Sequence, residues 1–203
     1  MLIQMSSRTN EERTRTSKAL LVASARRLFE EQGYAATSID DLAAAAGLTK
    51  GALYHHFPTK AALFESVIID IQDELASHVE ASAAKGDTAW DKFVAGWLAA
   101  LEVAPEAGIQ RLMLEAPTVL GYQRWQQIDD EHFMPAVTAS LQHLHAKGHL
   151  GLEPSQELTR VLLAISNALL TLITQAEEPA RARHQIIPIW ERLLGALRSP
   201  AQP

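Results

Sequence analysis

Residues 38–57 read SIDDLAAAAGLTKGALYHHF, and this stretch decides the fold class. Ser38 followed three residues later by Asp41 is a capping box, in which each side chain can bond the other residue's backbone N–H. The box predicts a short helix over 39–46 that Gly47 ends, because glycine accepts the backbone conformation of a tight turn.

A second short helix follows the glycine turn. Thr49 can cap a helix over 50–56, and Pro58 ends it because proline disfavours the α conformation in the residue before it. Alanines at the expected crossing let the two helices approach closely, and leucines can tie them together. Two short capped helices joined by a tight turn predict a helix-turn-helix.

The outward face of the second helix is a candidate DNA-binding surface. It carries Thr49, Lys50, Gly51, Tyr54 and His55. Lysine supplies a positive charge, hydroxyl groups can donate to phosphate oxygens, and glycine lets the backbone come close. Thr59 and Lys60 begin the next helix, where the backbone N–H groups also favour a phosphate.

Apolar spacing outside this stretch is helical throughout and predicts an all-α chain of about nine helices. We expect further helices over 13–32, 60–85, 89–103, 106–114, 122–147, 155–176 and 180–198. Pro117 is expected to mark a join, and Pro135 to kink or divide its helix. The expected organisation is a flexible start (1–12), a helix-turn-helix domain (13–60), a helical effector-binding and dimerisation domain (61–198) and a tail (199–203).

The composition of the chain indicates where the protein is found and how its charge is distributed. The 203 residues are 47% apolar and contain no cysteine, which excludes disulfides and thiolate chemistry and favours the cytoplasm. No secretory signal or membrane span is expected. The net charge of −6 is uneven: residues 1–60 hold eight Lys and Arg against six acids, and the rest holds ten against eighteen. An acidic chain can therefore still bind a polyanion through its N-terminal part.

Three segments, 37–43, 46–57 and 60–64, resemble the TetR/AcrR family of transcriptional regulators, and the likeness covers residues 13–68. The resemblance implies a recognition helix in the major groove formed by Lys50, Gly51, Ala52, Tyr54 and His55. It also implies phosphate contacts from Thr37, Tyr54 and Lys60. Family members are homodimers that bind palindromic operators and release them when a small molecule binds. Asp40 is anionic where the family can carry a basic residue, so we interpret it as a helix-start residue favoured by the dipole.

The two most apolar helices, near the end of the chain, are candidates for a dimer interface. Their candidate residues are Val161, Ile165, Leu169, Leu172, Ile186, Trp190, Leu193 and Leu197. Apolar residues occur on more than one face, so one face can pack on the body and another on a second subunit. The alternative is that both are internal helices of a monomer.

Large side chains in the middle of the chain are candidates for an effector pocket. They are Trp97, Leu101, Met113, Trp125 and Phe133, joined by Asn167 from an apolar helix. Apolar walls with few polar anchors suit a small apolar or aromatic ligand, although core packing explains any single one of them as well. Asn167 can orient a ligand or fix the dimer register.

Histidines and carboxylates gather at 129–132 and 143–149, and we interpret them as solvated polar residues. They lack the spacing of a metal motif, and no phosphate loop or nucleophile elbow is visible, so we expect no metal, cofactor or enzymatic activity. The sequence predicts a ligand-responsive regulator, a repressor that binds operator DNA as a homodimer. The alternatives are an activator, and an all-α ligand-binding or enzymatic protein that keeps this N-terminal fold without binding an operator.

Overall fold

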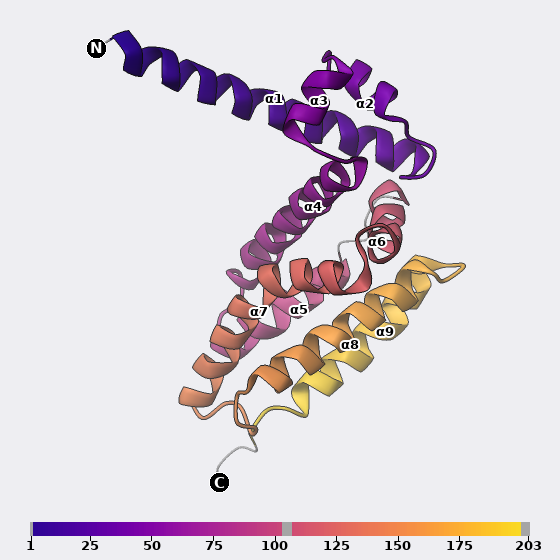
Figure 1. Ribbon diagram of the computed structural model, residues 1–203. Helices are drawn as coiled ribbons and strands as arrows, with labels where there is room; N and C mark the ends of the chain where they lie inside the picture. Colours follow the sequence, from indigo (N-terminus) through magenta and orange to yellow (C-terminus); the bar gives the residue numbers. More distant parts are fainter. Residues whose placement is uncertain (1, 103–106, 200–203) are drawn as a thin grey trace. The chain divides into compact units, whose positions relative to one another are not determined.

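The computed structural model describes residues 2–102 and 107–199, and this part of the chain forms nine helices (Figure 1). They are α1 (Leu2–Gln32), α2 (Ile39–Ala45), α3 (Lys50–His56), α4 (Lys60–Ala83), α5 (Ala89–Glu102), α6 (Ala107–Leu120), α7 (Tyr122–Ala146), α8 (Gln156–Thr174) and α9 (Pro179–Gly195). Among the described residues, extended pairing is limited to an isolated bridge between Leu150 and Arg198. The predicted all-α fold is confirmed.

Local capping signals place α2 and α3 where the sequence predicts them. Ser38 Oγ accepts from the Asp41 backbone N–H at 3.1 Å, and Asp41 Oδ2 accepts from the Ser38 N–H at 3.3 Å. Thr49 Oγ1 accepts from the Ala52 N–H at 3.2 Å. Gly47 has φ +67°, a conformation in which other residues are strained, so it closes the turn between the helices.

Some helix limits differ from the prediction. Helix α1 begins at Leu2, so the flexible start expected over 1–12 is helical from that residue. Helix α6 continues through Pro117 to Leu120, and α7 continues through Pro135. Proline removes one intrahelical hydrogen bond, and the neighbouring turns carry both helices past it. Of the predicted ends, 103, 106 and the tail from 200 onward lie outside the described residues.

The chain divides into two compact units, and the division lies within α4, between Ile71 and Gln72. We call the described residues up to Ile71, together with 107–126, the head unit. The described residues of 72–102 and 127–199 form the body unit. The predicted boundary at residues 60 and 61 therefore comes earlier than the observed one, and α6 belongs with the helix-turn-helix.

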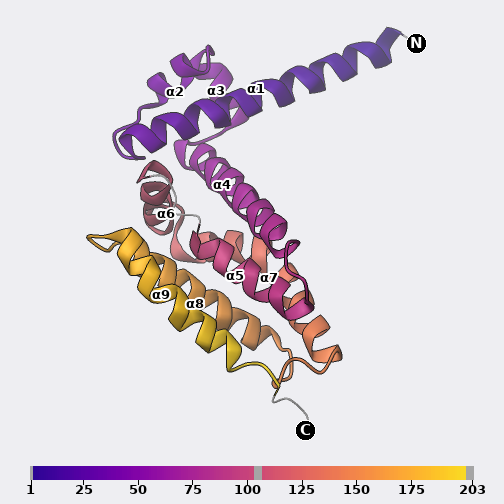
Figure 2. The ribbon, with the colours of Figure 1, turned by 180° about the vertical axis from the view of Figure 1, so that it is seen from behind.

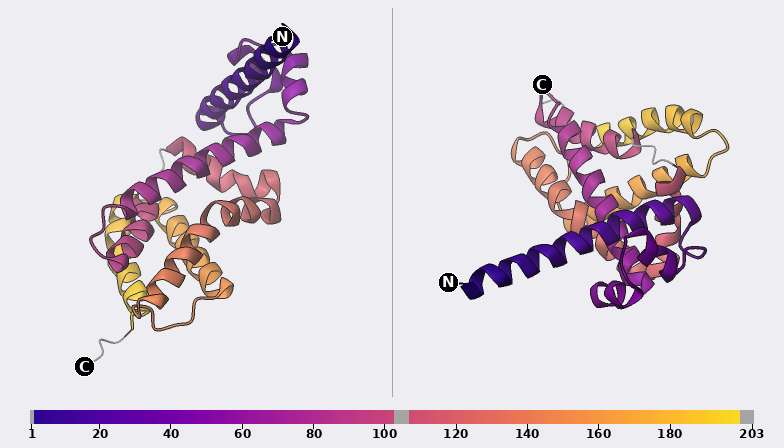
Figure 3. Two further views of the ribbon diagram at one scale, coloured as in Figure 1. Left: turned by 90° about the vertical axis from the view of Figure 1, so that its left-hand side faces the viewer. Right: turned by 90° about the horizontal axis from the view of Figure 1, so that it is seen from above.

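The core of the head unit joins the helix-turn-helix to α1 and the start of α4. Its buried apolar residues are Leu21, Ala25, Leu28, Phe29, Leu42, Ala43, Leu53, Phe57, Leu63, Phe64, Val67 and Ile68. Helix α1 packs against α2 and α6, and α2 packs against α3 (Figure 3). The rings of Phe29 and Phe64 meet edge to face with centroids 5.3 Å apart. Burial of Leu53 on the inner side of α3 turns the opposite side outward.

The core of the body unit lies among α5, α7, α8 and α9. It contains Trp90, Phe93, Trp97, Leu101, Leu141, Leu144, Leu150, Leu162, Leu163, Ile173, Trp190 and Leu194. Helices α8 and α9 lie side by side, as both Figure 1 and the reverse view in Figure 2 show. The rings of Trp97 on α5 and Trp190 on α9 meet at 89° with centroids 5.6 Å apart.

Candidate nucleic-acid interface

The outward face of α3 presents the polar residues that the sequence singles out. Thr49, Lys50, Gly51, Tyr54 and His55 are all exposed, and Ala52 is half-buried. Tyr54 is 45% exposed, a large exposure for an aromatic residue. The buried Leu53 fixes the rotation of the helix, so this face is directed to solvent.

Lys50 is paired with Asp40 at the start of α2. Lys50 Nζ lies 3.1 Å from Asp40 Oδ1 and 3.2 Å from Oδ2, and both side chains are exposed. An exposed pair of this kind contributes about 0–1 kcal/mol, so a phosphate or a base edge can displace it. Sequence reasoning placed Asp40 at the helix start but missed this contact, which spans the glycine turn.

Thr37 has a different place from the one that the resemblance implies. Its side chain is completely buried, and its hydroxyl donates to the Gly33 carbonyl at 2.8 Å. The Thr37 hydroxyl is therefore unavailable to a phosphate in this conformation, because the group is enclosed by its own turn. The Thr37 hydroxyl satisfies a backbone carbonyl four residues earlier and so stabilises the turn between α1 and α2.

Lys60 is also occupied within the head unit. Its ammonium donates to the carbonyl oxygens of Tyr34 at 2.7 Å and Thr37 at 2.9 Å. It also lies 4.1 Å from the centroid of the Tyr34 ring, a cation–π distance. These contacts hold the loop that leads into α2. A phosphate contact by Lys60 stays a prediction, and the contacts seen here leave its ammonium one N–H for that role.

Helix α6 contacts both the end of α1 and the loop that follows it. Glu115 Oε2 accepts from the Tyr34 backbone N–H at 2.8 Å, and Arg111 donates to the Glu31 carbonyl at 3.3 Å. Gly108 lies so close to Glu30 that a Cβ there would stand 2.9 Å from its carbonyl oxygen. Sequence reasoning missed these residues because nothing in the local pattern around α6 indicates its partner.

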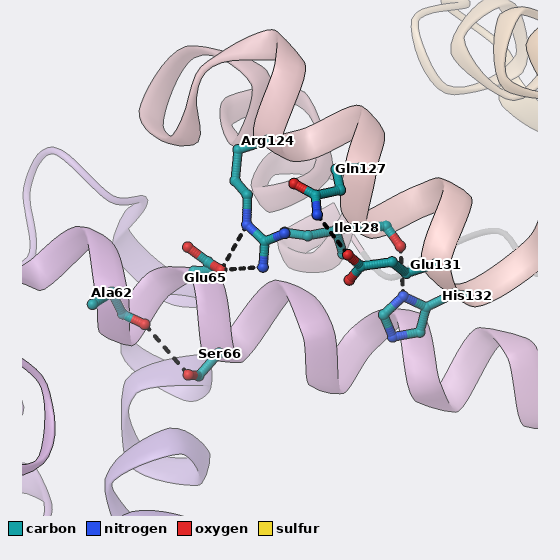
Figure 4. Close-up of polar contacts among 8 residues, drawn as sticks. All are labelled: Ala62, Glu65, Ser66, Arg124, Gln127, Ile128, Glu131 and His132. Atoms are coloured by element: carbon teal, nitrogen blue, oxygen red, sulfur yellow. Dashed lines mark hydrogen bonds and ion pairs between the residues drawn. The ribbon is translucent and has the colours of Figure 1, made fainter.

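A further ion pair fixes the start of α7 to α4 within the head unit. Arg124 donates to Glu65 Oε1 through Nε at 2.9 Å and through Nη2 at 2.6 Å (Figure 4). Both N–H groups of the fork converge on one oxygen, and both side chains are about a third exposed. The pair therefore orients α7 more than it stabilises the fold.

The candidate effector residues fall into both units. Trp97 and Leu101 are buried in the body core, and Phe133 packs against it. Met113 and Trp125 belong to the head unit and are half-buried. Trp125 Nε1 is buried without a hydrogen-bond partner among the described residues, so it is a donor that a polar group could satisfy.

Asn167 is half-buried and contacts the buried Asp129, which also contacts the buried Gln72, in the body unit. Its Nδ2 donates to Asp129 Oδ2 at 2.8 Å, and Gln72 Nε2 donates to Asp129 Oδ1 at 3.4 Å. Asp129 is 7% exposed, so its interpretation as a solvated residue was wrong. Trp125 and Phe133 lie four residues to either side of Asp129, and this apolar spacing is the signal that could have predicted its place on the inner face of the helix.

The dimer candidates divide into an outer and an inner set. Val161, Leu172 and Leu193 are exposed, while Ile165, Leu169, Ile186 and Leu197 are half-buried against the core. Trp190 is 1% exposed and contacts Trp97, so the structure removes it from the candidate interface. Its ring fills the body core instead. Ile189, another apolar residue of the same helix, is exposed.

The histidines and carboxylates do not gather into a metal centre within the described ranges, where no group of three or more such side chains is close enough. His145 Nδ1 lies 3.2 Å from the Leu152 carbonyl oxygen, and His132 Nε2 lies 3.3 Å from Asp73 Oδ1.

Helix α8 is long and apolar enough to cross a membrane. The core helix of a soluble protein can have the same length and composition, so this is weak evidence for a membrane span.

Comparison with known proteins establishes the family. The profile of bacterial regulatory proteins of the tetR family matches residues 21–67, and that of the tetracyclin repressor-like C-terminal domain matches residues 90–197. The second match alone spans more than half of the chain. The chain belongs to the TetR family of bacterial regulatory proteins, as the sequence resemblance predicted.

A solved TetR-family transcriptional regulator from Pectobacterium atrosepticum is similar along almost the whole chain. It is 31% identical with a TM-score of 0.79, covering 95% of this chain and 98% of its own. The transcriptional regulator CymR of Pseudomonas putida is 36% identical over 78 residues, which are 38% of each chain. AcrR of Shigella flexneri is 41% identical over 63 residues, 31% of this chain and 29% of its own. The matches to these curated relatives thus span less than half of their length.

Proposed function

We propose that this protein is a ligand-responsive transcriptional regulator, a repressor, that binds a palindromic operator as a homodimer in the cytoplasm. The outward face of α3 carries the proposal. It presents Lys50, Tyr54 and His55 to solvent over a rigid helix-turn-helix core, and the backbone at Gly51 is open. A helix with this exposed polar face suits base edges and phosphates in a major groove.

Selection of bound sequences from a random duplex pool tests operator binding directly. We expect an enriched palindrome whose half-sites lie about one helical turn apart. Tyr54→Ala is expected to lose the enrichment, and Tyr54→Phe, which keeps the ring and removes the hydroxyl, separates stacking from donation to phosphate. Absence of any enriched sequence at low salt would contradict operator binding.

The exposed apolar face of α8 and α9 supports the homodimer. Val161 and Leu172 on α8, and Ile189 and Leu193 on α9, are each about half exposed or more. An 18-residue apolar stretch of α8 is only 28% buried within a single chain, so most of it is free to contact a second copy. A second copy that covers this face would complete a four-helix interface.

Sedimentation of matched variants tests this interface. We expect Leu172→Glu to shift the protein from dimer to monomer, because a carboxylate would be buried against an apolar partner. Leu152→Glu is the control, since Leu152 is similarly exposed but lies in the loop between α7 and α8. A dimer that survives Leu172→Glu, or that Leu152→Glu disrupts equally, would place the interface elsewhere.

A small molecule in the body unit is the proposed release signal. The body core is rich in large aromatic rings, which suit an apolar ligand. A ligand that favours a dimer with wrongly spaced α3 helices would lower DNA affinity, and DNA would lower ligand affinity by the same factor. In vitro transcription from a promoter that carries the selected operator distinguishes a repressor, which lowers the transcript, from an activator.

A further inference from the structure

Gln72, Asp129 and the half-buried Asn167 form a polar cluster whose hydrogen-bonding capacity is only partly used. The three residues come from α4, α7 and α8 and all lie in the body unit. We call them the Asp129 cluster. Both carboxylate oxygens of Asp129 receive one amide donor each, at 3.4 Å from Gln72 and 2.8 Å from Asn167. A carboxylate has about four acceptor positions, so two donors leave capacity for more.

Gln72 supplies a second, independent unused acceptor. Its side chain is 1% exposed, and its Oε1 has no hydrogen-bond partner among the residues that the structure describes. This orphan Oε1 belongs to the same amide group whose Nε2 donates to Asp129. Leaving such an acceptor unpaired in the interior is costly. The cluster therefore offers unused acceptors at one place.

The carboxylate of the cluster also lacks a direct ion-pair partner among the described residues. In the described parts of the chain, Asp129 has two neutral amide partners and no ion pair. The basic side chains nearby have acidic partners of their own: His132 Nε2 lies 3.3 Å from Asp73 Oδ1, and Arg160 Nη2 lies 3.8 Å from Asp130 Oδ2. Burial raises the pKa of Asp129 and the neighbouring Asp130 raises it further, whereas the hydrogen bonds from Asn167 and Gln72 and the nearby His132 lower it. Burying an unpaired carboxylate is unfavourable, and a cation that brings N–H donors is the complementary partner.

We propose that the Asp129 cluster binds the cationic N–H group, an ammonium or amidinium, of an effector whose apolar part packs in the body unit. This rests on the proposed function, in which the body unit binds a small molecule. The cation donates to Asp129 and to Gln72 Oε1, while Asn167 keeps the carboxylate oriented. The cluster thereby selects for charge, and the aromatic core around Phe133 selects for an apolar body.

Matched pairs of probes that differ in charge test this chemistry. Benzamidine and biphenyl-4-carboxamidine are the cations, and benzamide and biphenyl-4-carboxamide are their neutral counterparts of nearly equal shape. Calorimetric titration and thermal unfolding of the full-length protein are measured with each. We expect the amidines to bind at least tenfold more tightly than the amides and to raise the melting temperature.

Variants assign the effect to the cluster. Asp129→Asn is expected to weaken the amidines at least tenfold and leave the amides unchanged, and Gln72→Leu is expected to weaken them less. Asp130→Asn removes the same charge one residue away and is expected to keep amidine binding. Circular dichroism confirms that each variant is folded, and the Gln72 variant retains the test if Asp129→Asn does not fold.

Three results would overturn the proposal: no binding of either amidine, equal binding of amidines and amides, or amidine binding that Asp129→Asn leaves intact. None of these measurements includes DNA. A protein that selects an operator but ignores the amidines would keep the proposed function and lose the cationic site. A protein that binds amidines through Asp129 but selects no operator would keep the cationic site and lose the proposed function.

Discussion

Replacing Lys60 with methionine separates a structural role from a role in binding phosphate. Methionine keeps an unbranched stem and removes the ammonium. The ammonium donates to the carbonyl oxygens of Tyr34 and Thr37 at 2.7 and 2.9 Å and stands over the Tyr34 ring. A hydrogen bond to a charged group contributes about 1.5–3 kcal/mol where water is excluded. Lys60 is half-buried, so water can replace part of this loss.

We therefore expect Lys60→Met to lower the free energy of unfolding by about 2 kcal/mol, counting both bonds at a reduced value. For a chain of this size, this corresponds to a fall in melting temperature of about 4–8 °C. Urea unfolding at fixed protein concentration measures the first quantity, and calorimetry measures the second. Lys50→Met is the matched control, because Lys50 has one exposed ion pair and is expected to change stability by less than about 0.5 kcal/mol.

The salt dependence of DNA affinity completes the test. A lysine that neutralises a phosphate contributes about 0.9 to the slope of log affinity against log salt concentration. We expect Lys50→Met to flatten this slope, and Lys60→Met to flatten it less, because two of the three N–H groups of Lys60 are occupied within the head unit. If Lys60→Met instead unfolds like the wild type and flattens the slope as much as Lys50→Met does, Lys60 binds phosphate and the structural interpretation is refuted.

Three further substitutions test other parts of the structure. Ser38→Ala removes the side-chain acceptor of the capping box, so urea unfolding should show a loss of about 1 kcal/mol, and an unchanged midpoint would contradict a role for the cap. Glu115→Ala leaves the Tyr34 N–H unpaired and should cost about 1–2 kcal/mol and speed amide exchange at Tyr34, whereas unchanged exchange would mean that α6 does not hold the loop. The pKa of Asp129 is raised by burial, so its ionisation destabilises the fold as the pH rises above the ordinary range of Asp. Asp129→Asn should therefore unfold at a higher temperature than the wild type at neutral pH and lose this advantage in acid, and a variant that is less stable at neutral pH would contradict the argument.

Most of the helix pattern could be predicted from the sequence. The limits of α3 are the predicted ones, and those of α2 differ by one residue, because caps and stops act between residues three or four apart. The end of α6 could not be predicted in this way. A proline shows only that one hydrogen bond is lost, and packing of the neighbouring residues decides whether the helix continues.

The candidate DNA-binding surface was predicted in outline and corrected in detail. Burial of Leu53 gives α3 its rotation, so the exposed face follows from helical periodicity. The partners of Lys60 and the burial of Thr37 do not follow from any local pattern. They depend on a loop whose carbonyl groups lie 26 and 23 residues away from Lys60 in the chain.

The sequence by itself determined the helical class, the capped helix-turn-helix and the family, since each of these depends on residues close together in the chain. Tertiary structure alone decided that Asp129 is buried with Asn167 and Gln72, 38 and 57 residues distant, and that Trp190 fills the core instead of facing a partner. The physical reason is that propensity and capping are local, whereas burial and the pairing of polar groups depend on which distant helices come to lie together.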